Sequence, residues 1–262
     1  MKPTRVLILC AVGLVCGTIA CAPARGAGAS WLLAMGFQKG EQIFEQSYEN
    51  DRVDWKLPEH RMEHFRAAGV IINEEQHITT TLTAKVVSII GGVAVLQGVA
   101  NVVSHDVPRQ TTQVSSDPFS AALGSDNLPV PAAAIDIDSA AMAGLPRQPL
   151  SVGKHWTTAL AVDTTLGSGH ATFDHVLVGS DNGLLEIAIR GQGRITGAEY
   201  HLPKLLPGSI SLYGTAWYDP VHKLVVQESY AIHNQLLKPM EGEQNGFDEQ
   251  LSVDTSTHVT HL

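Results

Sequence analysis

The chain has 262 residues and a mass of 28.0 kDa, and its 26 acidic and 17 basic residues give a net charge of −9. This negative balance argues against a nucleic-acid partner, because phosphates require a basic surface. With 44% hydrophobic residues, 24 Gly, 13 Pro and 3 Cys, the composition excludes collagen-like, disulfide-framework and fully disordered chains. The length suffices for one large β domain or two small ones.

The N-terminal residues have the pattern of a secretory signal. Lys2 and Arg5 precede an uncharged, largely apolar run over residues 6–20, and mostly small residues follow up to Ser30. A basic, then an apolar, then a small-residue region predicts a signal peptide over residues 1–29. The apolar run is shorter than the roughly 20 residues of a membrane span. We therefore expect an exported protein that is periplasmic or anchored to the outer membrane.

The signal offers three cleavage sites. Cleavage after Ala24 or Ala29 fits ordinary signal peptidase, which accepts small residues. Cleavage after Ala20 is the alternative, because residues 18–21 (TIAC) resemble a bacterial lipobox except at Thr18, and Cys21 would then carry a lipid anchor. The cysteines of the chain all lie in this leader, at Cys10, Cys16 and Cys21. The body therefore contains no disulfide, Cys-ligated zinc or thiol nucleophile.

Residues 30–104 are predicted to form an N-terminal β segment with one short helix. Residues 77–90 alternate between apolar side chains and a Thr-rich polar set, which indicates a half-buried strand. Gly91-Gly92 then predicts a hairpin turn, with residues 93–103 as the returning strand. Upstream, Pro58 is typical of the first turn of a helix, and Gly69 of its end.

Residues 105–148 lose strand periodicity and are rich in Pro, Ala, Ser and Asp. We predict a long loop here with one short helix around Ser139–Ala143. A connection this long is unusual inside a compact domain. It would either separate two β lobes or carry a functional flap.

Residues 149–262 are predicted to form a C-terminal antiparallel β segment in the same domain as residues 30–104. Alternation resumes strongly, and Asn182-Gly183 and Asp219-Pro220 are turn signals. The strands follow one another without intervening helices, which indicates an antiparallel meander. The predicted fold is mostly β, a curved half-barrel or a sandwich. The expected strands cover residues 156–163, 170–178, 185–190, 210–218, 224–232 and 251–259.

One motif points to a metal. Residues 60–64 (HRMEH) place His60 and His64 one helical turn apart beside Glu63, which resembles the inverted zinc-peptidase motif. That family needs a further Glu ligand on a following helix, and here a strand pattern follows instead. The alternative is a charged, solvent-facing helix. No G-x-S-x-G, P-loop or dinucleotide motif occurs, so we expect a non-enzymatic protein without a cofactor.

Aromatic residues provide the candidate ligand-binding residues. Tyr213, Thr215 and Trp217 share one face of a predicted strand. They would line a ligand site if a groove exists there. The alternative is that these side chains pack in the core or across strands.

Two segments of the C-terminal half carry a resemblance. Residues 149–156 (PLSVGKHW) resemble the P-x-x-V-G-x-x-W opening of exported bacterial β-proteins of unknown function. Residues 214–219 (GTAWYD) and 223–226 (KLVV) look like their later hairpin, except at His222-Lys223, where a turn glycine is common. These proteins are related to the half-barrels of the lipoprotein-localisation carriers. The resemblance covers about residues 149–236 and implies an envelope protein whose curved sheet cradles something apolar, with no enzymatic residues.

The expected function is therefore that of an exported cell-envelope protein that binds an apolar or extended ligand on a curved β-sheet. One alternative is a structural module that pairs with another envelope protein through a sheet edge. The other is a zinc metallohydrolase that uses His60, Glu63 and His64. The expected partners are an apolar ligand or an envelope protein, not nucleic acid, with membrane attachment if Cys21 is lipidated.

Overall fold

The computed structural model describes residues 29–198, 205–240 and 243–260. Strands make up 66% of the structure and form one eleven-stranded sheet, accompanied by a single helix, α1 (Glu59–Ala67), and a 3-10 turn, η1 (Ile137–Ser139). The strands are β1 (Gln42–Lys56), β2 (Asn73–Ile90), β3 (Val93–Asp106), β4 (Thr111–Leu123), β5 (Ile135–Asp136), β6 (His155–Asp163), β7 (Ser168–Asp181), β8 (Leu184–Ala198), β9 (Leu205–Asp219), β10 (Leu224–Met240) and β11 (Glu243–Thr260).

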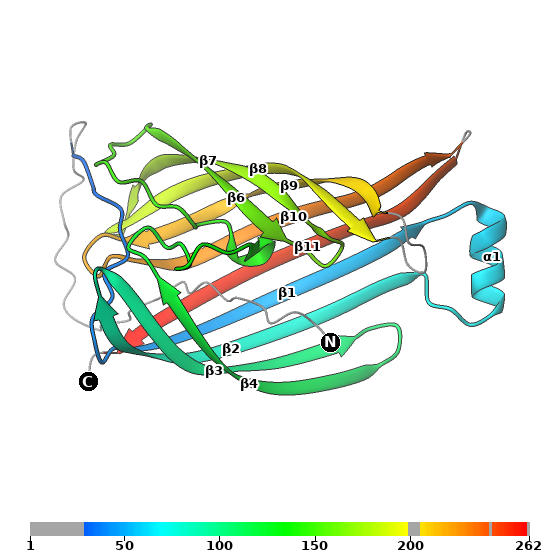
Figure 1. The fold of residues 1–262 in the computed structure, drawn as a ribbon, viewed down its shortest axis with the longest axis horizontal. Helices are drawn as coiled ribbons and strands as arrows, with labels where there is room; N and C mark the ends of the chain where they lie inside the picture. The colour runs from blue at the N-terminus through cyan, green and yellow to red at the C-terminus, as the bar shows by residue number, and fades with distance from the viewer. Residues whose placement is uncertain (1–28, 199–204, 241–242, 261–262) are drawn as a thin grey trace.

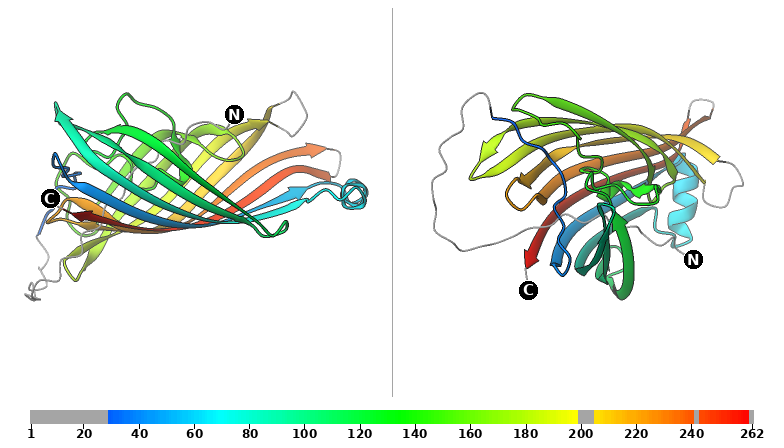
Figure 2. Two further views of the ribbon diagram at one scale, coloured as in Figure 1. Left: turned by 90° about the horizontal axis from the view of Figure 1, so that it is seen from below. Right: turned by 60° about the vertical axis from the view of Figure 1, so that its left-hand side comes forward.

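The sheet is a meander whose two halves meet through the first and last strands. The spatial order is β4-β3-β2-β1-β11-β10-β9-β8-β7-β6-β5, and every neighbouring pair is antiparallel except β5 and β6. The sheet does not close into a barrel. It curves strongly, so that one face is concave (Figures 1 and 2). The mostly β, antiparallel, curved half-barrel predicted from the sequence is confirmed.

The predicted turns are confirmed by their backbone angles. Gly91 and Gly92 join β2 to β3 with φ of 59° and 82°, and Asn182 and Gly183 join β7 to β8 with φ of 51° and 86°. Such positive φ values are the reason that Gly and Asn occupy these positions. The short helix is also confirmed as α1, which follows Pro58 and projects from one end of the sheet (Figure 1).

The prediction of a continuous loop over residues 105–148 is wrong, because β4 lies within it and pairs with β3 along its whole length. β4 is the edge strand and is exposed on both faces over most of its length. It therefore has no hydrophobic alternation that a sequence pattern could reveal. Its Pro118 is tolerated because an edge strand need not donate every N–H to a neighbour.

In place of the helix predicted around Ser139–Ala143, only the 3-10 turn η1 forms, and it ends at Ser139. The small residues that suggested a helix are buried instead, and their backbone bonds to other parts of the chain. The carbonyl of Met142 accepts from Asn127, and the carbonyl of Ala141 accepts from His175. Tertiary contacts thus take the place of helical hydrogen bonds.

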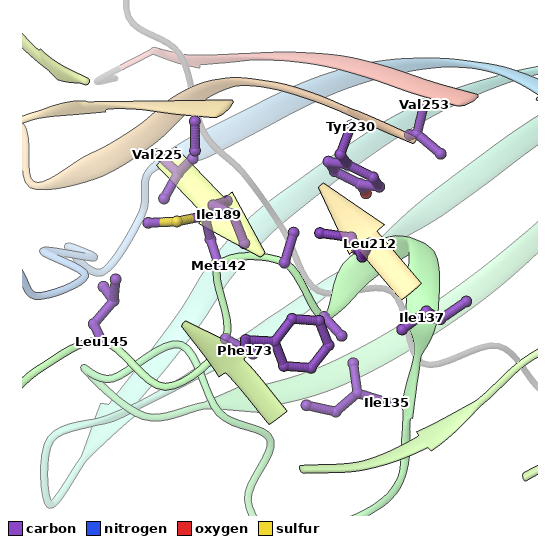
Figure 3. Packing of buried hydrophobic residues seen from close by; sticks show 14 of the residues in the cluster. Ile135, Ile137, Met142, Leu145, Phe173, Ile189, Leu212, Val225, Tyr230 and Val253 are labelled. Atoms are coloured by element: carbon purple, nitrogen blue, oxygen red, sulfur yellow. The ribbon is translucent and has the colours of Figure 1, made fainter. Parts of the chain in front are cut away.

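Two segments, residues 31–37 and residues 124–150, pack on the concave face near one end of the sheet, and we call them together the plug. They are joined by a bridge between Trp31 and Leu150 and by a hydrogen bond from Met35 N to the Ser125 carbonyl (2.7 Å). Ile135, Ile137 and Met142 of the plug are among the fully buried side chains. Figure 3 shows them beside sheet residues such as Phe173, Ile189 and Leu212, so the main core lies between plug and sheet.

Candidate binding face

The concave face is chemically divided. On β7, β8 and β9 it presents apolar side chains such as Phe173, Ile189 and Leu212, which pack against the plug. On β1, β10 and β11, strands at the centre of the sheet, the same face carries buried polar residues. The buried polar residues on these three strands are Glu45, Ser47, Glu228, Asn234, Glu249, Thr255 and Thr257.

The strand register arranges the acidic residues of this face in consecutive rows. Glu45 lies opposite Thr257, and two residues further along, Ser47, Thr255 and Glu228 form the next row. The third row is Glu49, Val253 and Tyr230, the fourth is Asp51, Leu251 and Ile232, and the fifth is Val53, Glu249 and Asn234. On β1, β10 and β11, each row therefore contains one carboxylate. We call Glu45, Glu228, Glu49, Asp51 and Glu249 the acidic lane.

The buried charge has one sign. Among the residues that the structure describes, the buried charged side chains are Glu41, Glu45, Glu228 and Glu249, and no Lys or Arg is buried. A carboxylate removed from water is costly unless hydrogen-bond donors, a cation or a proton compensate it. The lane therefore gathers acidic side chains on the inner face of the sheet.

Two neutral side chains of the lane's rows add further acceptors. Asn234 is 0% exposed and donates from Nδ2 to Oε2 of Glu249 at 2.5 Å, whereas its Oδ1 has no hydrogen-bond partner in the described chain. Thr257, also 0% exposed and opposite Glu45, has no partner for its hydroxyl within the same described ranges. Buried polar atoms are usually hydrogen-bonded. These two atoms are therefore exceptions among the buried polar atoms of this face.

The plug side of the face contains a buried histidine. His175 on β7 donates from Nε2 to the Ala141 carbonyl at 2.8 Å, and its ring stacks on Trp156 of β6 with centroids 4.5 Å apart. Burial lowers the pKa of His175, although the hydrogen bond to Ala141 acts in the opposite direction. The neutral ring therefore fixes the plug to the sheet.

A buried tyrosine fixes the other segment of the plug. The Tyr218 hydroxyl donates to the Ala34 carbonyl at 2.7 Å and accepts from the Ala34 N–H at 3.0 Å. Burial raises the pKa of Tyr218 to about 12, and the hydrogen bond to Ala34 partly opposes this rise. The phenol thus stays protonated and satisfies both backbone groups of one residue.

The structure places the predicted ligand residues on the opposite side of the sheet. Tyr213, Thr215 and Trp217 do share one face of β9, as predicted, but it is the outer face, since Leu212, Ala216 and Tyr218 are the buried positions of that strand. Tyr213 is 66% exposed. Alternation along the sequence correctly predicted that these three side chains share a face. It does not indicate which face of the sheet is concave.

The remaining candidates are not assembled into a site. His60 and His64 are exposed on α1, where His64 meets Phe65 edge-on. Within the described residues, no group of three or more His, Cys, Asp or Glu side chains is placed to hold a metal ion. Cys21, with the predicted lipid and cleavage sites, lies outside the described residues. No helix in the described chain is both long and apolar enough to cross a membrane.

Sequence reasoning missed the acidic lane. Glu45, Glu49 and Asp51 alternate in phase with Ile43 on β1, but acidic residues at alternate positions normally indicate the solvent side of a strand. The sequence did contain one indication of this arrangement. The positions of β1 that alternate with the acidic residues include Phe44 and Tyr48, so neither face of this strand is purely apolar. Register across three strands was needed to see the rows.

The sequence matches no protein-family model and no curated protein. Among solved structures, it is similar to an outer membrane channel from Pseudomonas putida F1, with 11% identity and a TM-score of 0.31 over 86% of this chain and 97% of that chain. It is also similar to the secretin-domain β-barrel of the Salmonella SPI-1 injectisome, with 5% identity and a TM-score of 0.18 over 86% of this chain and 63% of that one. These TM-scores are too low to define a shared fold.

Proposed function

We propose that this is an exported, non-enzymatic binding protein of the cell envelope that holds an elongated ligand along the concave face of its sheet. The predicted secretory leader supports export, and a body without cysteine suits any redox compartment. The observation that carries the binding function is the set of buried polar groups on β1, β10 and β11. Such groups weaken a core, so their presence on an inner face favours a role in binding.

The structure changes the expected ligand. The apolar part of the concave face is occupied by the chain's own plug, with Ile135, Ile137 and Met142 in the places that an apolar ligand would take. The polar rows follow the strands for several residues instead. An elongated ligand with polar groups therefore fits this face better than a purely apolar one.

The sheet edge supports the interaction-module alternative less well. β4 has a neighbour on one side only, and its exposed residues are mostly Ser, Thr and Gln. Pro118 and Asp117 lie in the middle of this strand. Proline and inward or flanking charge at an edge are features that discourage a further strand from pairing.

Native mass spectrometry of the mature protein purified from its own cell envelope tests the proposal. We expect a complex with one small molecule bound. We also expect the N-terminus of the protein to begin near residue 21, 25 or 30, and the protein to be recovered in the envelope fraction. The matched sample is protein refolded from denaturant, which should lack the added mass and regain it on incubation with an envelope extract. A mature protein that carries and regains no small molecule would contradict the proposed binding function.

A further inference from the structure

We propose that His77 and His105, on the outer face of the sheet, form a binding site for a divalent transition-metal ion that prefers imidazole ligands, such as Zn²⁺ or Cu²⁺. The observations that carry this proposal are the register between β2 and β3 and the hydrogen bonds of the two rings. The site is independent of the ligand proposed for the concave face, because it lies on the opposite side of the sheet.

The two histidines lie directly opposite each other on neighbouring strands. In the antiparallel pairing of β2 with β3, His77 is the Cα partner of His105 (Figure 1). Both alternate with buried positions of their strands, such as Ile78 and Ala100, so both side chains lie on the outer face. Opposite residues of an antiparallel pair have Cβ atoms about 4.5–5.5 Å apart. One ion, held about 2.0–2.1 Å from a nitrogen of each ring, can therefore bridge the two strands.

Each ring uses one nitrogen in a hydrogen bond and keeps the other for a metal ion. His77 contacts Glu75 Oε1 through Nε2 at 3.2 Å, and His105 contacts Thr112 Oγ1 through Nδ1 at 3.2 Å. Because a carboxylate accepts, Nε2 of His77 carries the proton and Nδ1 holds the lone pair. When Nδ1 of His105 donates to the hydroxyl, its Nε2 holds the lone pair in the same way. Histidines that bind metals almost always have such an oxygen partner on the second nitrogen.

The site is open to solvent, so an ion can enter and leave it without any rearrangement of the core. The side chain of His77 is 56% exposed and that of Glu75 is 41% exposed. An exposed contact of this kind contributes little to the stability of the fold, and two opposite imidazoles repel each other when both are protonated. A cation shared between the two neutral rings makes the same arrangement favourable.

The ligand set favours transition metals over Ca²⁺ and Mg²⁺. Imidazole nitrogen suits Zn²⁺, Cu²⁺ and Ni²⁺, whereas Ca²⁺ and Mg²⁺ take oxygen ligands. No group of three or more His, Cys, Asp or Glu side chains is placed to hold a metal ion within the described ranges, so the remaining coordination positions belong to water. A site with two protein ligands binds its ion reversibly, and we therefore expect exchange rather than permanent retention.

A second pair of histidines lacks these orienting contacts. His60 and His64 lie one turn apart on α1 and are exposed. In the part of the chain that the structure describes, neither ring makes a hydrogen bond, and His64 meets Phe65 edge-on. Both side chains must lose rotamer freedom when they bind an ion. The pair on β2 and β3 should therefore bind the first equivalent of metal.

NMR of the untagged mature protein tests which nitrogens bind the ion. Long-range proton–nitrogen spectra of the histidine rings are recorded while Zn²⁺ is added to protein stripped with EDTA. We expect the largest nitrogen shifts at Nδ1 of His77 and Nε2 of His105, complete at one equivalent. Shifts confined to His60 and His64, or spread evenly over the histidines, would overturn the proposal.

Isothermal titration with Zn²⁺ measures what each side chain contributes. His77→Asn and His105→Asn should each weaken binding by more than about tenfold, because one of the two ligands is lost. Glu75→Gln should weaken it by less than about tenfold, since it removes only an exposed acceptor that orients one ring. Mg²⁺ in excess should not compete. If a variant fails to fold, the ring shifts of the unsubstituted protein decide.

His170→Asn is the matched control for the loss of one exposed imidazole. His170 lies on the outer face of β7, where its cross-strand partners are Ala161 and Arg194 and not a second histidine. Its substitution should leave Zn²⁺ binding unchanged. Equal losses of affinity in His170→Asn and His77→Asn would mean that scattered histidines bind the ion, and the proposal would be wrong.

The double variant His60→Asn/His64→Asn separates the two histidine pairs. It should retain the first equivalent of Zn²⁺ with unchanged affinity, because that equivalent occupies β2 and β3. Loss of the first equivalent in this variant would assign the ion to α1 and overturn the proposal.

The metal site and the proposed binding function can fail separately. In native mass spectrometry, EDTA removes the mass of a metal ion, whereas a small molecule on the concave face stays bound. If the stripped protein shows no saturable binding of Zn²⁺ or Cu²⁺, the metal site is wrong and the binding function is unaffected.

Discussion

The plug side and the acidic lane lie on one face of one sheet but are built on opposite principles. On β7, Phe173 is fully buried against the plug, and the polar His175 beside it donates a hydrogen bond to the plug backbone. In the rows of the lane, Asn234 Oδ1 and Thr257 Oγ1 have no partner in the described chain. On the plug side, Asn127 Oδ1, Trp156 Nε1 and His175 Nδ1 also have no hydrogen-bond partner in the described chain, so the first region differs from the lane by its apolar packing. The second region is largely polar, so one curved sheet carries an apolar core beside a polar stretch of the same face.

The largest contrast is expected from truncating the core. Phe173→Ala should lower the free energy of unfolding by about 3–5 kcal/mol, because it leaves a cavity between sheet and plug. Tyr213→Ala, on the exposed outer face of β9, should change it by less than about 0.5 kcal/mol. Urea unfolding followed by circular dichroism measures both. Similar values for the two variants would mean that the plug does not form the main core.

A glycine of the plug gives the next largest effect. Gly144 has φ of +80°, and an added Cβ would approach Thr158 Cγ2 to 2.2 Å. Gly144→Ala should therefore cost about 2–3 kcal/mol from backbone strain and overpacking together. Gly153→Ala is the control, since its φ is +83° but nothing lies within 4 Å of the added atom. It should cost about 1 kcal/mol, from strain alone, and equal losses would contradict a close approach of plug and β6.

The buried histidine should make the plug side sensitive to acid. Burial lowers the folded-state pKa of His175 below the ordinary histidine value of about 6.5, so between these two pKa values the unfolded chain binds the additional proton. Its contribution to stability is complete above pH 6.5 and is lost as pH falls toward the folded-state pKa, by at most about 1.4 kcal/mol per pH unit.

Urea unfolding between pH 7.5 and 5, with hydrogen exchange of residues 124–150, measures this dependence. His175→Asn should reduce the slope, whereas His170→Asn, on the exposed side of β7, should not. If the free energy of unfolding depends on pH equally in the two variants, His175 is not the origin of the pH dependence. In the lane we expect no corresponding histidine effect, because its titratable residues are acidic.

The smallest expected effects come from two Thr→Val substitutions, which should change the free energy of unfolding in opposite directions in the two regions. Thr257→Val removes a buried hydroxyl without a partner in the described chain and should raise the free energy of unfolding by about 0.5–1 kcal/mol. Thr158→Val removes a hydroxyl that donates to the Gly144 carbonyl at 2.9 Å and should lower it by about 1 kcal/mol. Thermal unfolding distinguishes them. A loss of stability in Thr257→Val would show that this hydroxyl is satisfied in the free protein.

The sequence predicted those parts of the fold that depend on local chemistry. Alternation over residues 77–90 and the glycines at 91–92 defined β2 and its turn, because one face of this strand is buried and the turn needs positive φ. β4 was missed because an edge strand has no buried face to impose a pattern. The plug was missed because its conformation depends on contacts far away in the chain, such as that between Ala34 and Tyr218.

The candidate site was harder to predict than the fold. Tyr213, Thr215 and Trp217 were correctly placed on one face, but the side of the sheet that is concave depends on the curvature of all eleven strands. The rows of the acidic lane combine β1 with β10 and β11, which are far apart in the sequence. A binding surface made by register becomes visible only when the strands are paired.

The pairing of the first strand with the last also governs how this protein can be made. Gln42 of β1 lies opposite Thr260 of β11, so the two hairpin arrays cannot join until the chain has been synthesised as far as β11. Contacts between residues so distant in sequence slow folding, because the entropy of a long loop must be lost first. This order of events leaves the sheet as two unjoined arrays until the last strand is available, so the complete fold forms late.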